Sequence, residues 1–233
     1  MKIMKIERPP KRVIEDLKKI STATAWSVLG SLGIKSVSMR GIFPLKPNTK
    51  MVGPAQTLYY LPLREDKEYT AEDLRKSAAM RLAEETKPGD VIVVDSGGPG
   101  YYGGMGDVMI TGFAVKKAAG MVFDGVIRDS PYVRTLEMPV FCCGVQPSTT
   151  PRNMPVAANV MVRCGGVLVC PGDIVMGDDD GVIVIPKEKA EQVAELGLER
   201  EKIEKYSRRL LESGKPLNYA YPPKREWLDN PPI

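Results

Sequence analysis

The chain has no histidine among its 233 residues, and this absence removes several kinds of active site. Without an imidazole there is no Ser-His-Asp or Cys-His nucleophile system, no histidine general base and no histidine-ligated zinc. Acid–base chemistry in this protein must therefore use Asp, Glu, Lys, Tyr, Cys or bound water.

Cysteine is sparse as well, and its spacing is not that of a zinc or redox motif. The four residues are Cys142, Cys143, Cys164 and Cys170, with no C-x-x-C pair, and three of them lie in apolar runs. Such thiols are typical of a buried core in a reducing compartment. Because no basic residue neighbours Cys142-Cys143 to lower a thiol pKa, the pattern favours a core role over catalysis.

Long apolar runs and strong charge are also missing. No apolar run approaches the length of about 20 residues that a helix needs to span a bilayer. The opening MKIMKIERPPKR lacks the apolar core of a signal peptide. The net charge of +4 is too small and too scattered to indicate nucleic-acid binding. We therefore expect a cytoplasmic protein without membrane or nucleic-acid partners.

Glycine, in contrast, is concentrated ahead of one apolar segment. Six of the residues 97–106 are glycine, between a predicted strand at 91–95 and a predicted helix that begins at Asp107 or Val108. Glycine lets backbone N–H groups approach a ligand closely, and the first N–H groups of a helix have no partner within it. The segment therefore predicts an anion-binding site.

A cation and a carboxylate follow at the end of the next predicted strand. The apolar run 120–127 ends in Arg128-Asp129, which offers a fork for a carboxylate and a ligand for a hard metal. Each residue also has an ordinary alternative: a surface ion pair, Asp129 capping a short helix over 131–136, or Asp107 as a favourable acid in a first helical turn. Their position after the glycine segment favours the functional interpretation.

A nucleotide site is another alternative. The residues Gly98-Pro-Gly100-Tyr-Tyr-Gly103 match the G-x-G-x-x-G fingerprint, and Asp124 lies about where a ribose-binding acid is expected. In that fingerprint the third glycine already lies in the helix, whereas here Gly104 and Gly106 follow and would weaken a first helical turn. The pattern favours a loop of another kind, with nucleotide binding as the lesser reading.

The periodicity of the chain predicts one α/β domain over residues 1–214 and a proline-rich arm over 215–233. A capping box at Thr70 opens one of the helices. The arm has five prolines with Tyr219, Tyr221 and Trp227, so we expect it to be neither helix nor central strand and to pack its aromatic rings on a neighbouring surface. Helices are expected at 11–32 (broken near Ser21), 71–85 and 186–213, and strands at 51–63, 91–95, 120–127, 140–145, 156–162, 167–169, 174–176 and 182–185.

Two stretches resemble a known family. Gly106-Asp107, followed after twenty residues by Arg128-Asp129, resembles the signature of the RraA-like proteins, and the segment from Pro171 to Pro186 resembles their closing hairpin. The resemblance covers roughly residues 20–186. The family includes class II pyruvate aldolases that cleave 4-hydroxy-4-methyl-2-oxoglutarate and 4-carboxy-4-hydroxy-2-oxoadipate, and the regulator of ribonuclease activity A.

The resemblance implies a fold and a site. The fold would be the swivelling β/β/α form of an α/β domain, with a long C-terminal helix and an extended tail, assembled as homotrimers or hexamers with active sites at subunit interfaces. Asp129 would bind Mg²⁺ or Mn²⁺ directly, and Asp107 would position the water that moves a proton. The groups that would hold the small α-keto acid are Arg128 and the backbone amides of Gly106, Asp107, Val108 and Met109.

The function implied is a metal-dependent carbon–carbon lyase. It would release pyruvate from a 4-hydroxy-2-oxo acid or decarboxylate oxaloacetate. In the aldolases a neighbouring subunit supplies a glutamate, for which Glu199 or Glu201 is the candidate here. Tyr132 stands where the family often has an acid. The alternative is a non-catalytic regulator of a ribonuclease.

Overall fold

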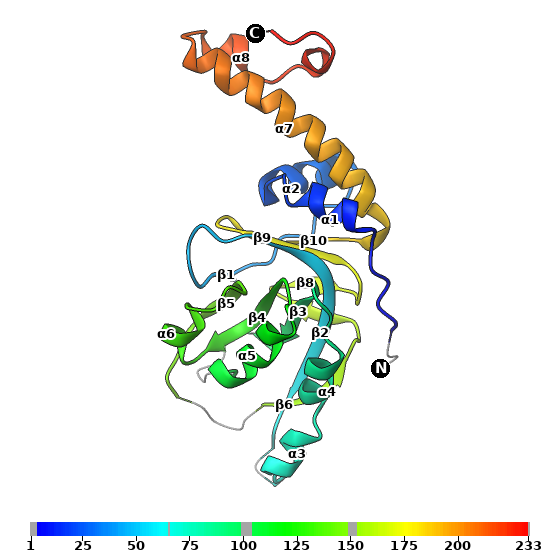
Figure 1. Ribbon diagram of the computed structural model, residues 1–233, viewed down its shortest axis with the longest axis vertical. Coiled ribbons are helices and arrows are strands. Elements are labelled where there is room, and N and C mark those ends of the chain that lie inside the picture. The colour runs from blue at the N-terminus through cyan, green and yellow to red at the C-terminus, as the bar shows by residue number, and fades with distance from the viewer. Residues whose placement is uncertain (1–3, 65, 99–103, 149–152, 233) are drawn as a thin grey trace.

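A computed structural model describes residues 4–64, 66–98, 104–148 and 153–232 of the chain. In these residues a mixed β-sheet forms the centre, and a long C-terminal helix projects away from it (Figure 1). The strands of the main sheet are β1 (Phe43–Pro44), β2 (Met51–Pro62), β3 (Val91–Asp95), β4 (Gly120–Ile127), β5 (Val140–Val145), β6 (Asn153–Ala158), β9 (Ile174–Asp178) and β10 (Gly181–Ile185). A separate hairpin consists of β7 (Val162–Cys164) and β8 (Val167–Val169).

The strand order places the ends of four parallel strands at one edge. Along the sheet the order is β1-β5-β4-β3-β2-β9-β10, and β6 also pairs with β2. Strands β2, β3, β4 and β5 run parallel, so their carboxyl ends meet at the same edge. Ser38 bridges to Ile183 of β10 and brings the far edges together, which makes the sheet barrel-like and nearly closed.

Helices cover the sheet and extend beyond it. Near the N-terminus, α1 and α2 pack on the first part of the C-terminal helix (Figure 1). The α-helices are α1 (Lys11–Leu17), α2 (Thr22–Ser31), α3 (Ala71–Arg75), α4 (Ala78–Glu85), α5 (Asp107–Val115), α6 (Ser130–Val133), α7 (Ala190–Glu212) and α8 (Leu217–Ala220), with 3-10 turns η1 (Lys187–Lys189) and η2 (Arg225–Leu228). None of the helices in the described ranges is both long and apolar enough to cross a membrane.

Strand β3 shows how the sheet divides the core. Its residues are buried on both faces, as parallel strands usually are. Ile92 and Val94 face the core that includes α4 and α5, whereas Val91 and Val93 face the core under the β7–β8 hairpin. Because side chains alternate, Asp95 lies on the hairpin side.

Most predicted elements are confirmed, and the exceptions have local causes. The break near Ser21 is confirmed, since the Ser21 hydroxyl caps α2 by accepting from Thr24 N. The capping box of Thr70 and Asp73 is present, but the single helix expected over 71–85 is wrong. Ser77 caps a second helix there by accepting from Met80 N, and this divides α3 from α4.

The strand expected at 156–162 is also wrong in its extent. Strand β6 ends at Ala158, and β7 begins at Val162. Asn159 adopts a left-handed conformation (φ 54°) between them, which turns the chain out of the extended form. Asparagine tolerates this region better than most residues, so a polar residue in an apolar run was the available signal.

The arm is not fully extended, which corrects the expectation of a tail without helix. It forms α8 and η2, and α8 tolerates Pro216 because this proline precedes the first helical residue, where a missing N–H costs nothing. The arm folds back on α7, where Trp227 and Ala220 are buried with Leu210 in a small separate cluster. Tyr219 and Tyr221 remain exposed, so only the expectation for Trp227 is confirmed. The domain boundary at residue 214 stays a prediction.

Candidate active site

The glycine-rich segment returns to the sheet beside β4. Gly104 N donates to Val126 O at 2.9 Å, and Arg128 N donates to Met105 O at 3.1 Å. These bonds place residues 104–106 in line with β3, beyond the point where that strand ends. Gly106 then becomes the N-cap of α5. The hydrogen bonds therefore fix the helix N-terminus against the end of β4.

Arg128 and Asp129 meet this helix N-terminus. Arg128 Nε donates to Asp129 Oδ2 at 3.0 Å, and Asp107 N points to the same oxygen at 3.4 Å. A Cβ on Gly106 would lie 2.6 Å from Asp129 Oδ2 and 3.2 Å from Arg128 Nε. The close approach of the carboxylate thus depends on glycine at this position.

Asp129 holds its side chain in place through an uncommon backbone conformation. Its φ of 58° and ψ of 31° are left-handed, which is rare outside glycine and often occurs at functional sites. It stands at the N-cap position of α6 but makes no side-chain cap hydrogen bond there. The capping alternative is therefore wrong, and the carboxylate turns to Arg128 and Asp107 instead.

The electrostatics keep the Asp129 carboxylate charged. Hydrogen bonding to the Arg128 guanidinium lowers the pKa of Asp129, and the backbone N–H of Asp107 acts in the same direction. The Arg128 and Asp129 side chains are 38% and 35% exposed, so a ligand can reach both. The site therefore combines a fixed anion, a fixed cation and a helix N-terminus.

The predicted amides are brought together, but two of them already have acceptors. Val108 N donates to Asp107 Oδ1 at 2.8 Å, and Asp107 N is directed at Asp129. Met109 follows in the first turn of α5, half-buried, while the Val108 side chain is exposed. A ligand anion at this helix end must therefore share these N–H groups with the two carboxylates.

The donor set fits a hard divalent cation. Mg²⁺ is usually held by one or two carboxylates with water or substrate oxygens in the remaining positions. Asp129 supplies such a carboxylate, with Oδ2 oriented by Arg128. In the described ranges, this site included, no three Cys, Asp or Glu residues converge as metal ligands, so a cation at Asp129 would take its other ligands from water or substrate. The candidate position for Mg²⁺ or Mn²⁺ is thus Asp129.

The two candidate glutamates lie on α7, which projects away from this edge (Figure 1). Glu201 accepts from Thr24 Oγ1 at 2.7 Å and from Ser21 N at 3.2 Å, so it fixes the N-terminus of α2. Glu199 lies 3.6 Å from Arg225, and its side chain is 44% exposed. Of the two, Glu199 is the more available to another molecule.

The sequence did not predict that two buried carboxylates, Asp95 and Asp124, pair next to the site. Asp95, at the end of β3, and Asp124, within β4, are register partners, each 5% exposed. Asp124 accepts from Gly165 N at 3.1 Å, and burial raises its pKa. A buried side chain bound to backbone is not a ribose ligand, so the role considered for Asp124 is wrong. Gly100 and Gly103 lie outside the described residues.

Two of the four cysteines are core residues, and the other two are partly exposed. All four are free thiols, with Cys142 and Cys164 buried. Burial and the adjacent Asp124 carboxylate raise the pKa of Cys143 to about 11. These thiols therefore stay protonated near neutral pH, and the prediction against a catalytic thiol stands.

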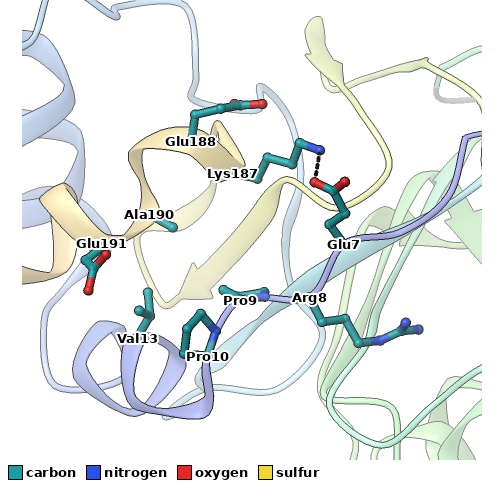
Figure 2. A pocket seen from close by; sticks show the side chains of 9 residues that line it. All are labelled: Glu7, Arg8, Pro9, Pro10, Val13, Lys187, Glu188, Ala190 and Glu191. Atoms are coloured by element: carbon teal, nitrogen blue, oxygen red, sulfur yellow. Dashed lines mark hydrogen bonds and ion pairs between the residues drawn. The ribbon is translucent and has the colours of Figure 1, made fainter.

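A crevice of about 390 Å³ lies far from this site, between the N-terminal arm and the start of α7 (Figure 2). Pro9, Pro10 and Val13 form its apolar wall. Most of its charges are matched within the chain, since Lys187 Nζ lies 2.7 Å from Glu7 Oε2, Arg8 pairs with Asp90 and Glu191 with Arg12. The crevice marks where the arm crosses the base of α7.

Known proteins share this sequence and fold. The family profile "RraA-like: Aldolase/RraA" matches residues 17–184. A protein of Halalkalibacterium halodurans described as "Putative 4-hydroxy-4-methyl-2-oxoglutarate aldolase" is 36% identical over 152 residues, which is 65% of this chain and 67% of that protein. "Protein DlpA" of Legionella pneumophila is 28% identical over 93% of this chain, which spans only 35% of DlpA.

A solved structure extends the likeness to three dimensions. The crystal structure of Streptomyces coelicolor RraAS2, "an unusual member of the RNase ES inhibitor RraA protein family", superposes with a TM-score of 0.79. The two proteins are 38% identical, over 88% of this chain and 99% of RraAS2. The Gly106-Asp107 and Arg128-Asp129 pairs, which the fold brings into contact, lie within residues 17–184, the range that the family profile matches. The chain belongs to the RraA-like family of aldolases and RraA proteins.

Proposed function

We propose that this protein is a divalent-metal-dependent lyase that breaks a carbon–carbon bond in a 4-hydroxy-2-oxo acid or in oxaloacetate and releases pyruvate. One observation carries the proposal: the Asp129 carboxylate, the Arg128 guanidinium and the N-terminus of α5 converge where Gly106 leaves room for them. The likeness to the Halalkalibacterium protein supports the reaction class.

Arg128 and α5 would bind the substrate. Arg128 gives its Nε to Asp129, and its terminal amino groups are the fork that would hold the carboxylate and keto oxygen of a 2-oxo acid. The amides at the start of α5 would stabilise negative charge on the same oxygens as the bond breaks. Mg²⁺ or Mn²⁺ at Asp129 would add Lewis acidity at the keto group.

Asp107 would serve proton transfer. Its Oδ1 accepts from Val108 N, which fixes the side chain beside the site, and the carboxylate would there hold a water. In aldol cleavage the water held by Asp107 would take the 4-hydroxyl proton, and the C4–O bond would become a carbonyl as the C3–C4 bond breaks. The electron pair of that bond would pass to C3 as the pyruvate enolate, and C3 would then take a proton back from water. Decarboxylation of oxaloacetate ends with the same protonation. Neither reaction requires histidine.

The test is pyruvate release with Mg²⁺, Mn²⁺ or excess EDTA, from 4-hydroxy-4-methyl-2-oxoglutarate and from oxaloacetate. Asp129→Asn is the variant to use, because asparagine tolerates the left-handed backbone. Asp66→Asn, which removes an exposed acid paired with Arg64, is the matched control. We expect metal-dependent turnover that is lost only in Asp129→Asn. Equal rates in the two variants, after subtraction of metal-catalysed decarboxylation without enzyme, would contradict the proposed site.

A homotrimer or hexamer is part of this proposal, with Glu199 of a neighbouring copy reaching the site. Helix α7 projects away from its own sheet (Figure 1), and Glu199, near the middle of this helix, has a side chain that is 44% exposed and so available to another copy. Glu201 is less suited, because its hydrogen bonds hold α2.

The similarity to RraAS2 favours a second candidate, a non-catalytic regulator that binds a ribonuclease. This function would need the surface of the molecule and not the charge of Asp129. Tight binding to an RNase E-type enzyme that Asp129→Asn retains, together with no metal-dependent pyruvate release, would favour the regulator.

A further inference from the structure

A second cavity opens at the carboxyl edge of the parallel strands. It has a volume of about 470 Å³ and lies at the ends of β2 and β3, with β6 and β7 forming its other walls. This volume is within the usual range for a small-molecule pocket. The residues that matter for its chemistry are Tyr59, Leu61, Asp95, Gly97, Gly98 and Arg163.

The cavity is separate from the Arg128–Asp129 site but shares its edge of the sheet. Asp95 ends β3 and pairs in register with Asp124, which precedes Arg128 by four residues along β4. The cavity borders the start of the glycine-rich segment, at Gly97 and Gly98, whereas Asp129 contacts its end at Gly106. Ligands of open α/β sheets characteristically bind outside the carboxyl ends of parallel strands.

Arg163 is the charge that the cavity offers. Its guanidinium is exposed, and the described residues give it neither a hydrogen bond nor an ion pair. The other charged lining residue, Asp95, is turned to the backbone: Oδ1 accepts from Gly97 N and Oδ2 from Arg163 N, both at 3.0 Å. The hydrogen bond from Arg163 N to Asp95 fixes the backbone of Arg163 and so positions its side chain at the cavity.

Apolar surface and open space complement this cation. The Tyr59 ring is half-buried, and Leu61 is 39% exposed, so both present apolar area that a ligand would cover. Gly97 and Gly98 have φ values of 86° and 99°, and no atom lies within 4 Å of where a Cβ would be. The floor of the cavity is therefore free of side chains at these two positions.

We propose that this cavity binds a small organic acid, with its carboxylate on the Arg163 guanidinium and its apolar body against Tyr59 and Leu61. Guanidinium–carboxylate pairs are bidentate, and planar groups stack on tyrosine, so an aromatic monocarboxylate fits best. The binding needs neither a metal nor Arg128, so it is independent of the lyase activity.

The experiment is a titration of the protein with benzoate in the presence of EDTA. Binding is detected by saturation-transfer difference NMR. Wild type should give a saturable signal, and Arg163→Gln should weaken binding about tenfold or more, because a charge-assisted pair is lost. Arg163→Lys should recover part of the affinity. Arg208→Gln, which removes an exposed arginine on α7, and Arg128→Gln should both bind like wild type.

Three outcomes would overturn the proposal: no saturable binding by wild type, unchanged affinity in Arg163→Gln, or a loss confined to Arg128→Gln. The last would assign the probe to the Arg128–Asp129 site. Circular dichroism of each variant excludes unfolding as the cause. Pyruvate release is assayed separately, so failure here leaves the lyase proposal unaffected, and failure there leaves this cavity unaffected.

Discussion

The side chain that Gly106 lacks sets the spacing of the candidate site. We expect Gly106→Ala to fold, since its φ of −111° is open to alanine, but to push Asp129 and Arg128 apart. A displacement of this size costs on the order of 100-fold in turnover. Mn²⁺ affinity and metal-dependent pyruvate release would measure the loss.

Gly112→Ala is the control in the same helix. A Cβ there meets no atom within 4 Å, so alanine should leave turnover unchanged and stabilise the helix by about 1 kcal/mol. If both variants lose activity alike, the close approach at Gly106 is not the cause.

The buried Asp124 predicts a pH dependence of stability. Its folded-state pKa is raised by burial, so ionisation near neutral pH opposes folding, and this cost disappears as the pH falls below the unfolded pKa. Asp124→Asn keeps an acceptor for Gly165 N and removes a charge beside Asp95. We expect a higher Tm than wild type at pH 7 to 8. The difference should shrink toward pH 4, and a gain independent of pH would refute the explanation.

At the residue scale, the sequence was sufficient to predict which residues meet at the site, but not which backbone conformations they adopt. Asp107, Arg128 and Asp129 could be predicted because each follows a strand end or starts a helix. The left-handed backbone of Asp129 depends on tertiary contacts. The pairing of Asp95 with Asp124 was not predicted, and Asp124 was given the wrong role, because an acid in an apolar run has the same sequence pattern whether it binds a ligand or a backbone N–H.

At the element scale, buried strands and long helices were predictable, and interruptions were not. Strand β3 consists of apolar residues up to its terminal acid, and α7 has an apolar face over many turns, so period alone identifies both. The division between α3 and α4 depends on one hydroxyl, that of Ser77, which competes with continuation of the helix. Such a balance of small free energies is not visible in a pattern.

The arm gives a prediction at this scale. Trp227→Ala removes the largest side chain of the cluster that joins the arm to α7, at a local cost of about 3–5 kcal/mol. Because this cluster is separate from the cores under the sheet, we expect faster hydrogen exchange at residues 203–212 and an unchanged Tm for the sheet. Tyr219→Ala, which truncates an exposed ring, is the control and should change neither. Cooperative loss of the whole fold would contradict this.

At the scale of the whole molecule, the projection of α7 predicts complementation between copies. If Glu199 acts in a neighbour's site, Asp129→Asn and Glu199→Gln are each inactive alone. Mixed oligomers should regain about a quarter of the sites, since half supply an intact Asp129 and half of those face an intact Glu199. Pyruvate release after joint unfolding and refolding measures this, and a mixture that stays inactive would exclude site sharing.

The left-handed backbone at Asp129 also limits which substitutions the protein can accept at this position during evolution. Most side chains are strained in this region, so folding removes those variants before selection on chemistry begins. Asparagine is accepted, and a single base change converts an aspartate codon to it. Such a change deletes the charge and keeps the outline of the molecule. If Asp129 holds the proposed metal, a duplicated gene is one base change from a protein of the same shape that has lost both the metal and the proposed lyase activity.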